Sequence, residues 1–139
     1  MAGRSIDNLH KRWKNKHNSV LVFVIFWRIN SAWRKLLIHV IAKITTSPGK
    51  RQEVLAAFLA NVPAVLAEKG CIEYQPVTDS KDATDFQSDI GPDTFIVVEK
   101  WATLDDLKAH AKSEHMAAYG SKVRDMIADR AVHVLENVG

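Results

Sequence analysis

Side chains that can move protons or bind an aromatic ring are concentrated in residues 99–120, EKWATLDDLKAHAKSEHMAAYG. His110 and His115 are the main candidates for a general base, because the unperturbed pKa of histidine, ~6.5, lies near neutral pH. On a helix, Tyr119 shares a face with His115, which lies four positions before it. The stretch predicts a catalytic pocket, and the alternative for each histidine is a role at the surface or in helix packing.

The two histidines converge only if the helix that carries them is interrupted. Five positions apart on one continuous helix, their side chains would diverge by about 140°. Ser113 lies between His110 and His115 and belongs to the residue types that favour helix N-caps. A break at Ser113 could therefore bring the two rings together.

Glu99 and Trp101 are two positions apart in an apolar segment that we interpret as a strand, so they share one face with Phe95 and Val97. A carboxylate on that face needs a partner, either a structural hydrogen bond or a substrate. Trp101 and Tyr74 also have two interpretations, because a large aromatic side chain can fill a core or line a pocket.

The chain lacks the sequence motifs of several kinds of chemistry. The sequence has no HExxH, no CxxC and no cluster of three ligands, so we expect no metal site. It has no Gly-rich phosphate loop and no GxSxG, which argues against nucleotide chemistry and serine hydrolysis. The single cysteine, Cys71, cannot form an internal disulfide and begins an apolar segment, and we interpret it as a buried, inert thiol.

Basic charge is concentrated at the beginning of the chain. Residues 1–36 contain eight Lys and Arg and one Asp, a net charge of +7, whereas residues 37–139 contain eleven Lys and Arg and fifteen Asp and Glu, a net charge of −4. A mildly acidic domain does not favour nucleic-acid binding. The apolar run at residues 20–27 is short of the ~20 residues of a membrane span. We expect residues 1–36 to be an extension outside the domain, with a signal or membrane-surface anchor as the alternative.

From residue 37 onward, apolar patterns and turn signals predict strand, helix, strand, strand, helix, strand. Pro48 suits the first turn of the first helix, Pro63 predicts a kink in it, and Gly70 suits its C-terminal cap. Thr103 is placed to cap the next helix. The expected strands are 37–46, 71–78, 94–102 and 130–137, the expected helices are 48–69, 104–112 and 114–128, and residues 79–93 form a polar loop.

This order, with helices on one face of an antiparallel sheet, is typical of a ferredoxin-like α+β domain, βαββαβ. The third strand is apolar on both faces at residues 95–98, whereas a strand with one face in water should alternate. We therefore expect a second copy of the chain to cover the open face and to form a dimeric α+β barrel, whose interior could be the site. His39 and His133 lie on strands from which either could face that interior.

Residues 37–139 resemble the antibiotic biosynthesis monooxygenase family, and within it the small cofactor-independent quinol monooxygenases. The resemblance is carried by VIAKITTSPGKRQEVL, VPAVLAEKGCIEYQPVTD, FQSDIGPDTFIVVEKWATLDDLKAH and EHMAAYGSKV. It covers the whole predicted domain and does not extend into residues 1–36. It implies a cytoplasmic homodimer that oxidises a quinol or similar phenolic compound with dioxygen to the quinone, without flavin, haem or metal.

Such a reaction needs a base that deprotonates the quinol and an apolar cavity for a flat ring. His110 and His115 are the leading candidates for the base, followed by His39 and His133. The expected substrate-binding residues are Trp101, Tyr74, Phe86, Tyr119, Met116, Glu99 and His39.

Two other functions remain open at this point. An isomerase or aldolase-like enzyme that processes a small phosphorylated sugar would need cations at the mouth of the cavity, and Lys43 and Lys100 are the obvious strand lysines. A haem-handling or non-catalytic ligand-binding barrel would give a coloured or an inert protein.

Overall fold

The computed structural model describes residues 37–83 and 85–138. The expectations for residues 1–36 lie outside this part of the chain. In chain order the elements are β1 (Ile38–Thr46), α3 (Arg51–Leu66), β2 (Cys71–Val77), β3 (Thr94–Trp101), α4 (Leu104–Ala111), α5 (Glu114–Val123), the 3₁₀ turn η1 (Arg124–Met126) and β4 (Ile127–Glu136). A search of the described residues finds no helix long and apolar enough to cross a membrane.

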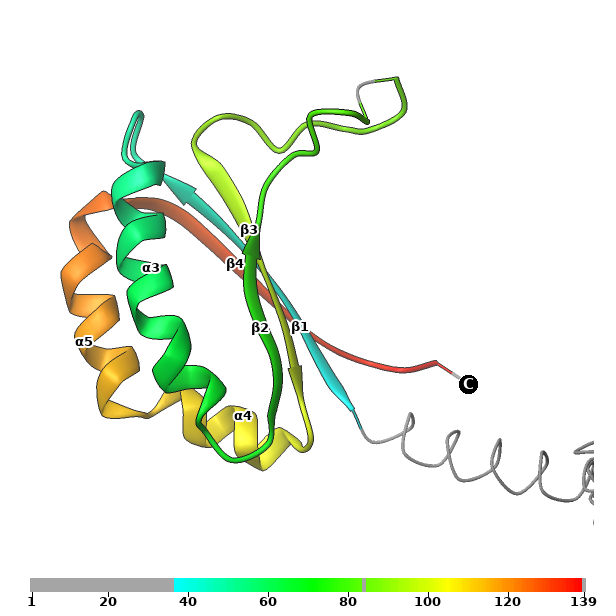
Figure 1. The fold of residues 1–139 in the computed structure, drawn as a ribbon, viewed down its shortest axis with the longest axis vertical. Helices are drawn as coiled ribbons and strands as arrows, with labels where there is room; N and C mark the ends of the chain where they lie inside the picture. Colours follow the sequence, from blue (N-terminus) through cyan, green and yellow to red (C-terminus); the bar gives the residue numbers. More distant parts are fainter. Residues whose placement is uncertain (1–36, 84, 139) are drawn as a thin grey trace, which may run out of the picture. The chain divides into compact units, whose positions relative to one another are not determined.

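The four strands form one antiparallel sheet in the order β2-β3-β1-β4 (Figure 1). Helices α3 and α5 lie side by side against one face of this sheet, and α4 lies near one end of the same face (Figure 1). The arrangement is βαββαβ, and it confirms the predicted ferredoxin-like α+β fold.

The register of the sheet places the core on the face that the helices cover, which we call the helix face. Val40 of β1 lies opposite Glu99 of β3 on this face. Strand β3 alternates between buried and partly exposed side chains. Its buried side chains on the helix face are Phe95, Val97, Glu99 and Trp101.

The opposite face of the sheet, which we call the open face, has no helix packed on it among the described residues (Figure 1). Its side chains are mixed, with His39 opposite Lys100 and Ile41 opposite Val98. Leu135 of β4 lies on the same face and is 47% exposed. This is the face that the sequence analysis expected a second copy of the chain to cover.

Thr103 and Ser113 mark the starts of the two short helices, and only Thr103 makes a side-chain cap hydrogen bond. Thr103 Oγ1 accepts a hydrogen bond from the Asp106 N–H at 3.1 Å, which confirms the predicted N-cap of α4. Helix α4 ends at Ala111, and Ser113 has an extended backbone that begins α5, so the predicted break is confirmed. The Ser113 hydroxyl donates to the His110 carbonyl at 2.9 Å and ties the break to the residue that carries the first histidine.

The first helix differs from its prediction at its end and at its proline. It ends at Leu66 rather than at residue 69, and it runs through Pro63 as a continuous helix. Gly70 follows in a turn with φ +79°, a conformation that other residues adopt at a cost. A Cβ atom at Gly70 would lie 2.3 Å from Asp106 Oδ2, so this glycine lets the chain pass close to α4.

The predicted boundary between the last helix and the last strand is wrong by several residues. The helix expected over residues 114–128 ends at Val123, and η1 follows it. Strand β4 begins at Ile127, because that residue already pairs with Thr46 of β1 across an irregularity in the register. The Ser47 N–H donates to the Met126 carbonyl at 2.8 Å and holds this junction.

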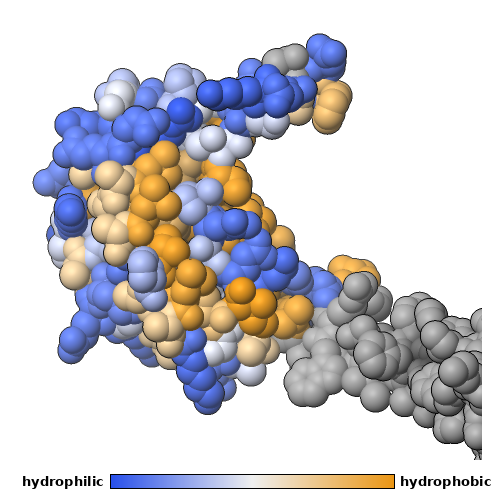
Figure 2. All heavy atoms as spheres, in the orientation of Figure 1, coloured by the Kyte–Doolittle hydropathy of each residue, from blue (hydrophilic) through white to orange (hydrophobic). Residues whose placement is uncertain are grey.

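Apolar residues reach the surface over α3 and β2, between hydrophilic patches (Figure 2). Leu59 and Leu66 of α3 are 55% and 51% exposed, and Ile72 of β2 is 53% exposed. Only some of the apolar residues of α3, such as Val54 and Phe58, therefore belong to the core.

Candidate active site

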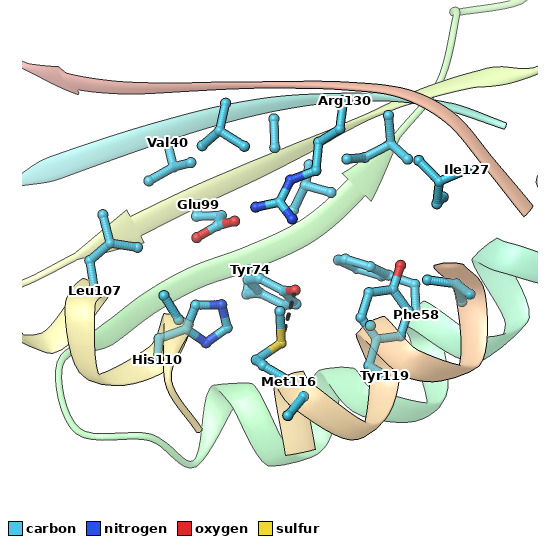
Figure 3. A pocket seen from close by; sticks show the side chains of 18 of the residues that line it. Val40, Phe58, Tyr74, Glu99, Leu107, His110, Met116, Tyr119, Ile127 and Arg130 are labelled. Atoms are coloured by element: carbon cyan, nitrogen blue, oxygen red, sulfur yellow. Dashed lines mark hydrogen bonds between the residues drawn. The ribbon is translucent and has the colours of Figure 1, made fainter. Parts of the chain in front are cut away.

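A cavity of about 750 Å³ lies between the helix face of the sheet and helices α4 and α5 (Figure 3). Pockets that bind small ligands commonly have volumes of ~300–1,000 Å³. Its apolar lining from the sheet includes Val40, Ala42, Val97 and Val132. The cavity lies on the other side of the sheet from the open face, where the sequence predicted a barrel interior that could be the site.

His110 is buried in the wall of this cavity, with 4% of its surface exposed. Its Nδ1 lies 3.1 Å from both carboxylate oxygens of Glu68. Because a carboxylate only accepts hydrogen bonds, we assign the ring proton to Nδ1, which leaves Nε2 with a free lone pair. The ring packs against Trp101 at a centroid distance of 4.7 Å and against Tyr74 at 5.4 Å.

Glu68 also contacts the second histidine. His115 Nε2 lies 2.5 Å from Glu68 Oε1, and the two histidine rings are 6.4 Å apart. The break at Ser113 thus brings His110 and His115 together, although His115 does not line the cavity. Sequence reasoning missed Glu68, which lies just after α3 and has no pattern that marks it as inward-facing.

Glu99 has the structural partner that a carboxylate on an apolar face requires. The Trp101 Nε1–H donates to Glu99 Oε2 at 2.8 Å. Burial raises the pKa of the Glu99 carboxyl above its ordinary value, and the Trp101 hydrogen bond and the charges of His110 and Arg130 oppose that rise. Glu99 also lines the cavity, whereas Trp101 is fully buried behind His110 and does not.

Two tyrosines line the cavity beside Phe58, which sequence reasoning did not select. Phe58 stacks on Tyr74 at 4.9 Å and meets Tyr119 edge-on at 5.9 Å. The Tyr74 hydroxyl donates to Met116 Sδ at 3.9 Å. Burial raises the pKa of Tyr74, helped by the charge of Glu99, and it raises the pKa of Tyr119 to about 12 against the charge of Arg130. Both phenols keep their protons at neutral pH.

Two arginines that the sequence analysis did not single out also line the cavity, Arg124 of η1 and Arg130 of β4. Arg130 pairs with Ile44 of β1, on the helix face. The pattern that could have identified Arg130 in the sequence is its spacing of two from Val132, and of four from Val134, because all three face the cavity.

Several predicted residues do not lie at the cavity. Phe86 is in the loop between β2 and β3, with 87% of its surface exposed. His39 and His133 lie on the open face, opposite Lys100 and Ile41. His39 Nε2 is buried there without a hydrogen-bonding partner among the described residues.

Neither the cysteine thiol nor the side chains that could bind a metal form a further reactive site in the described part of the chain. Cys71 is only partly buried, so the prediction of a buried thiol is wrong in that respect. Its partial burial and the nearby charges of Glu68 and Glu99 raise the pKa of the thiol, which fits an unreactive cysteine. No group of three His, Cys, Asp or Glu side chains within residues 37–83 and 85–138 is arranged to hold a metal ion.

Comparison with known proteins places this chain in a family. The family model described as antibiotic biosynthesis monooxygenase matches residues 37–122. The chain is 37% identical over 102 residues to the probable quinol monooxygenase YgiN of Escherichia coli K12, which covers 72% of this chain and 97% of that protein.

Solved structures share the fold at lower sequence identity. A conserved protein from Methanosarcina mazei superposes with a TM-score of 0.66 at 20% identity, over 78% of this chain and 99% of that chain. A conserved protein from Bacteroides thetaiotaomicron superposes with a TM-score of 0.61 at 21% identity, over 74% of this chain and 99% of that chain. These structures show the shared fold, and the family match with the 37% identity shows that the chain belongs to the antibiotic biosynthesis monooxygenase family.

Proposed function

We propose that the chain is a cofactor-independent monooxygenase that uses dioxygen to oxidise a quinol or a similar phenolic compound to the quinone. The observation that carries the proposal is His110, a buried histidine held by Glu68 in the wall of a mainly apolar cavity. Family membership and the identity to a probable quinol monooxygenase support this class of reaction.

The first step requires a base within reach of the substrate hydroxyl. With its Nδ1–H donated to Glu68, His110 can take the phenolic proton on Nε2. The Glu68 carboxylate then lies beside the imidazolium and stabilises its positive charge. The ionised phenol is far richer in electrons than the neutral one, so it can reduce dioxygen directly.

The remaining steps pass electrons from the substrate to dioxygen. A hydroquinone gives up two electrons and two protons and leaves as the quinone, while dioxygen becomes hydrogen peroxide. A phenol with hydrogen on its para carbon takes one oxygen atom onto that carbon and also becomes the quinone, while the other oxygen atom leaves as water. The chain binds, orients and deprotonates the substrate in both cases.

The cavity walls suit a flat ring with hydroxyl groups. The stacked rings of Phe58 and Tyr74 offer an aromatic surface. Both tyrosine hydroxyls remain protonated at neutral pH, since burial raises the pKa of both. The Tyr119 hydroxyl can donate a hydrogen bond to a substrate oxygen, whereas the single proton of the Tyr74 hydroxyl already points at Met116 Sδ. Apolar walls also keep water away from the ionised substrate.

Oxygen uptake with a chemically reduced naphthoquinone tests the proposal. We expect uptake in proportion to the protein added, formation of the quinone, and a protein spectrum without a visible band. Catalase returns half of the consumed oxygen if peroxide is the product and none if water is. Absence of protein-dependent uptake with quinols and phenols of one, two and three rings would contradict the proposal.

One observation supports the isomerase or aldolase-like alternative. Arg124 and Arg130 supply the cations that a phosphorylated sugar would need at the cavity. Lys43 and Lys100, which the sequence suggested for this task, lie on the open face instead. Turnover of a sugar phosphate without oxygen uptake would select this alternative, and a coloured protein would select the haem-handling one.

A further inference from the structure

Arg130 lines the cavity and has no task in the proposed reaction. It comes from the helix face of β4, opposite Ile44 of β1. Its guanidinium group points from β4 into the cavity, on the side opposite His110 (Figure 3). A ligand that spans the cavity would therefore contact both residues.

The guanidinium has no ion pair or hydrogen bond with the other residues that the structure describes. Its charge nevertheless reaches two groups of the cavity, because it opposes the rise that burial causes in the pKa of Glu99 and of Tyr119. Arginine presents five N–H donors in a planar fork that matches a carboxylate. An unpaired fork that points into a cavity is a site for an anionic group of a ligand.

The surroundings of Arg130 define where that group would lie. Val132 and Val134 follow it on the same face of β4, line the cavity, and are 44% and 49% exposed. The cavity is thus open along β4, while His110 lies in its buried wall. An anionic group would remain near the opening, and the ring would extend inward.

The charges that line the cavity favour an anion. Arg124 and Arg130 are both cationic, and Glu99 is the carboxylate among the lining residues. Glu99 Oε2 already accepts the Trp101 hydrogen bond, and burial raises the pKa of this carboxyl, which weakens its repulsion of an anion.

We propose that the substrate is an aromatic acid, a phenol or quinol whose ring bears a carboxylate, and that Arg130 binds this carboxylate while the hydroxyl lies at His110. This inference rests on the proposed function for the reaction at the hydroxyl. The binding preference itself is independent of turnover, so the two can be tested separately.

Calorimetric titration without oxygen measures the preference directly. The probes are a hydroxynaphthoate and the neutral naphthol that lacks its carboxylate. We expect the acid to bind the wild-type protein about 10- to 100-fold more tightly than the naphthol, the usual range for charge-assisted hydrogen bonds. Arg130→Gln should lose most of this advantage and bind the naphthol as the wild type does. Arg130→Lys should recover part of it, because the charge remains and the planar fork does not.

Lys43→Gln is the matched control, because it removes the same charge from the open face of the neighbouring strand β1. It should leave both affinities unchanged. Equal affinity for acid and naphthol in the wild type, or equal weakening of both by Arg130→Gln with an unchanged melting temperature, would overturn the proposal. Tighter binding of a pentose phosphate than of the aromatic acid would also overturn it and favour the sugar-phosphate alternative.

The oxygen electrode separates the two proposals. A preference for the acid without oxygen uptake from any dihydroxynaphthoate would reject the monooxygenase and leave the binding inference standing. Oxygen uptake with equal kcat/KM for quinols with and without a carboxylate would reject the inference and leave the monooxygenase standing.

Discussion

Glu68 contacts two histidines whose other ring nitrogens have different surroundings. The His110 ring lines the cavity, whereas His115 does not, and His115 Nδ1 is buried without a partner among the described residues. We therefore expect His110 to be the base and His115 to be a positioning residue that holds the Glu68 carboxylate in place.

Replacement of His110 by alanine should lower kcat for quinol oxidation by about 10²- to 10⁴-fold, the typical contribution of a general base. His115→Ala should lower it by roughly tenfold or less, because His115 acts only through Glu68. Oxygen uptake at saturating quinol measures both effects. Full activity in both variants and in the double variant would place the base elsewhere, with His39 and His133 next to be replaced.

Glu68→Gln keeps the size of the side chain but removes its charge and lets an amide N–H face His110 Nδ1. We expect kcat to fall about 10- to 100-fold with little change in KM, since the carboxylate stabilises the imidazolium and touches no substrate. Glu68→Asp should recover part of the rate. Glu114→Gln makes the same charge change at an exposed position of α5 and serves as the control. An unchanged kcat in Glu68→Gln would rule out this role.

Glu99 should make stability depend on pH in a predictable direction. Burial raises the pKa of its carboxyl in the folded state above the unfolded value, so the folded state favours the proton. Stability from this group is complete below the unfolded pKa and is lost as the pH rises through the folded pKa. Glu99→Gln removes this loss and should raise Tm at about pH 8 more than at about pH 4. An equal change in Tm at both pH values in thermal melts would contradict the assignment.

Sequence reasoning selected the cavity residues that have distinctive types and a predictable face. Glu99 follows the alternation of β3, and His110 lies just before a recognisable helix break. Glu68 and Arg130 are ordinary charged residues by composition. Whether such a residue faces inward depends on tertiary register, which a single sequence does not show.

Two of the residues predicted to bind substrate lie away from the cavity, Phe86 and His39. Phe86 is predicted to bind substrate although it falls in the predicted polar loop, and it lies exposed in that loop. His39 was selected as a strand histidine, and the register puts it on the open face. A period of two predicts which residues share a face, but it does not say which face the helices cover.

At the scale of elements, Gly70 controls the approach of α3 and α4. Gly70→Ala should lower the free energy of unfolding by about 1–3 kcal/mol, because φ there is +79° and the new Cβ would lie 2.3 Å from Asp106 Oδ2. Gly120→Ala in α5 is the control, with no atom within 4 Å of its Cβ, and should not lower stability. Urea unfolding measures both, and equal stability of Gly70→Ala and wild type would contradict the close approach.

The order of elements and their N-caps could be predicted because local signals set them. Thr103 caps α4 as expected from its residue type, and Ser113 stands at the predicted start of α5, although its hydroxyl bonds back to the His110 carbonyl and makes no cap hydrogen bond with α5. Element ends were less predictable. Strand β4 begins at Ile127 because β1 pairs with it there, and that pairing is not a property of the local sequence.

At the scale of the whole molecule, the apolar residues on the open face of the sheet indicate that two copies of the chain associate. We expect a homodimer joined through these faces, because Ile41, Val98 and Leu135 would otherwise leave apolar surface in water. Sedimentation at micromolar concentration should give about twice the chain mass of 15.6 kDa. Val98→Lys should give monomers, and Ala56→Lys, on the exposed side of α3, should not. A monomeric wild type would contradict the barrel.

The groups assigned to the reaction and those assigned to the substrate come from different parts of the chain. Glu68 follows the end of α3 and His110 belongs to α4, whereas Arg130 and Val132 belong to β4, which pairs only with β1 in the described sheet. We expect substitutions at cavity-facing positions of β4 to leave the hydrogen bonds that hold His110 intact, because Glu68 makes them. The proposed substrate contacts and the proposed chemistry can therefore be changed separately, and β4 is the segment to randomise when a new substrate is sought.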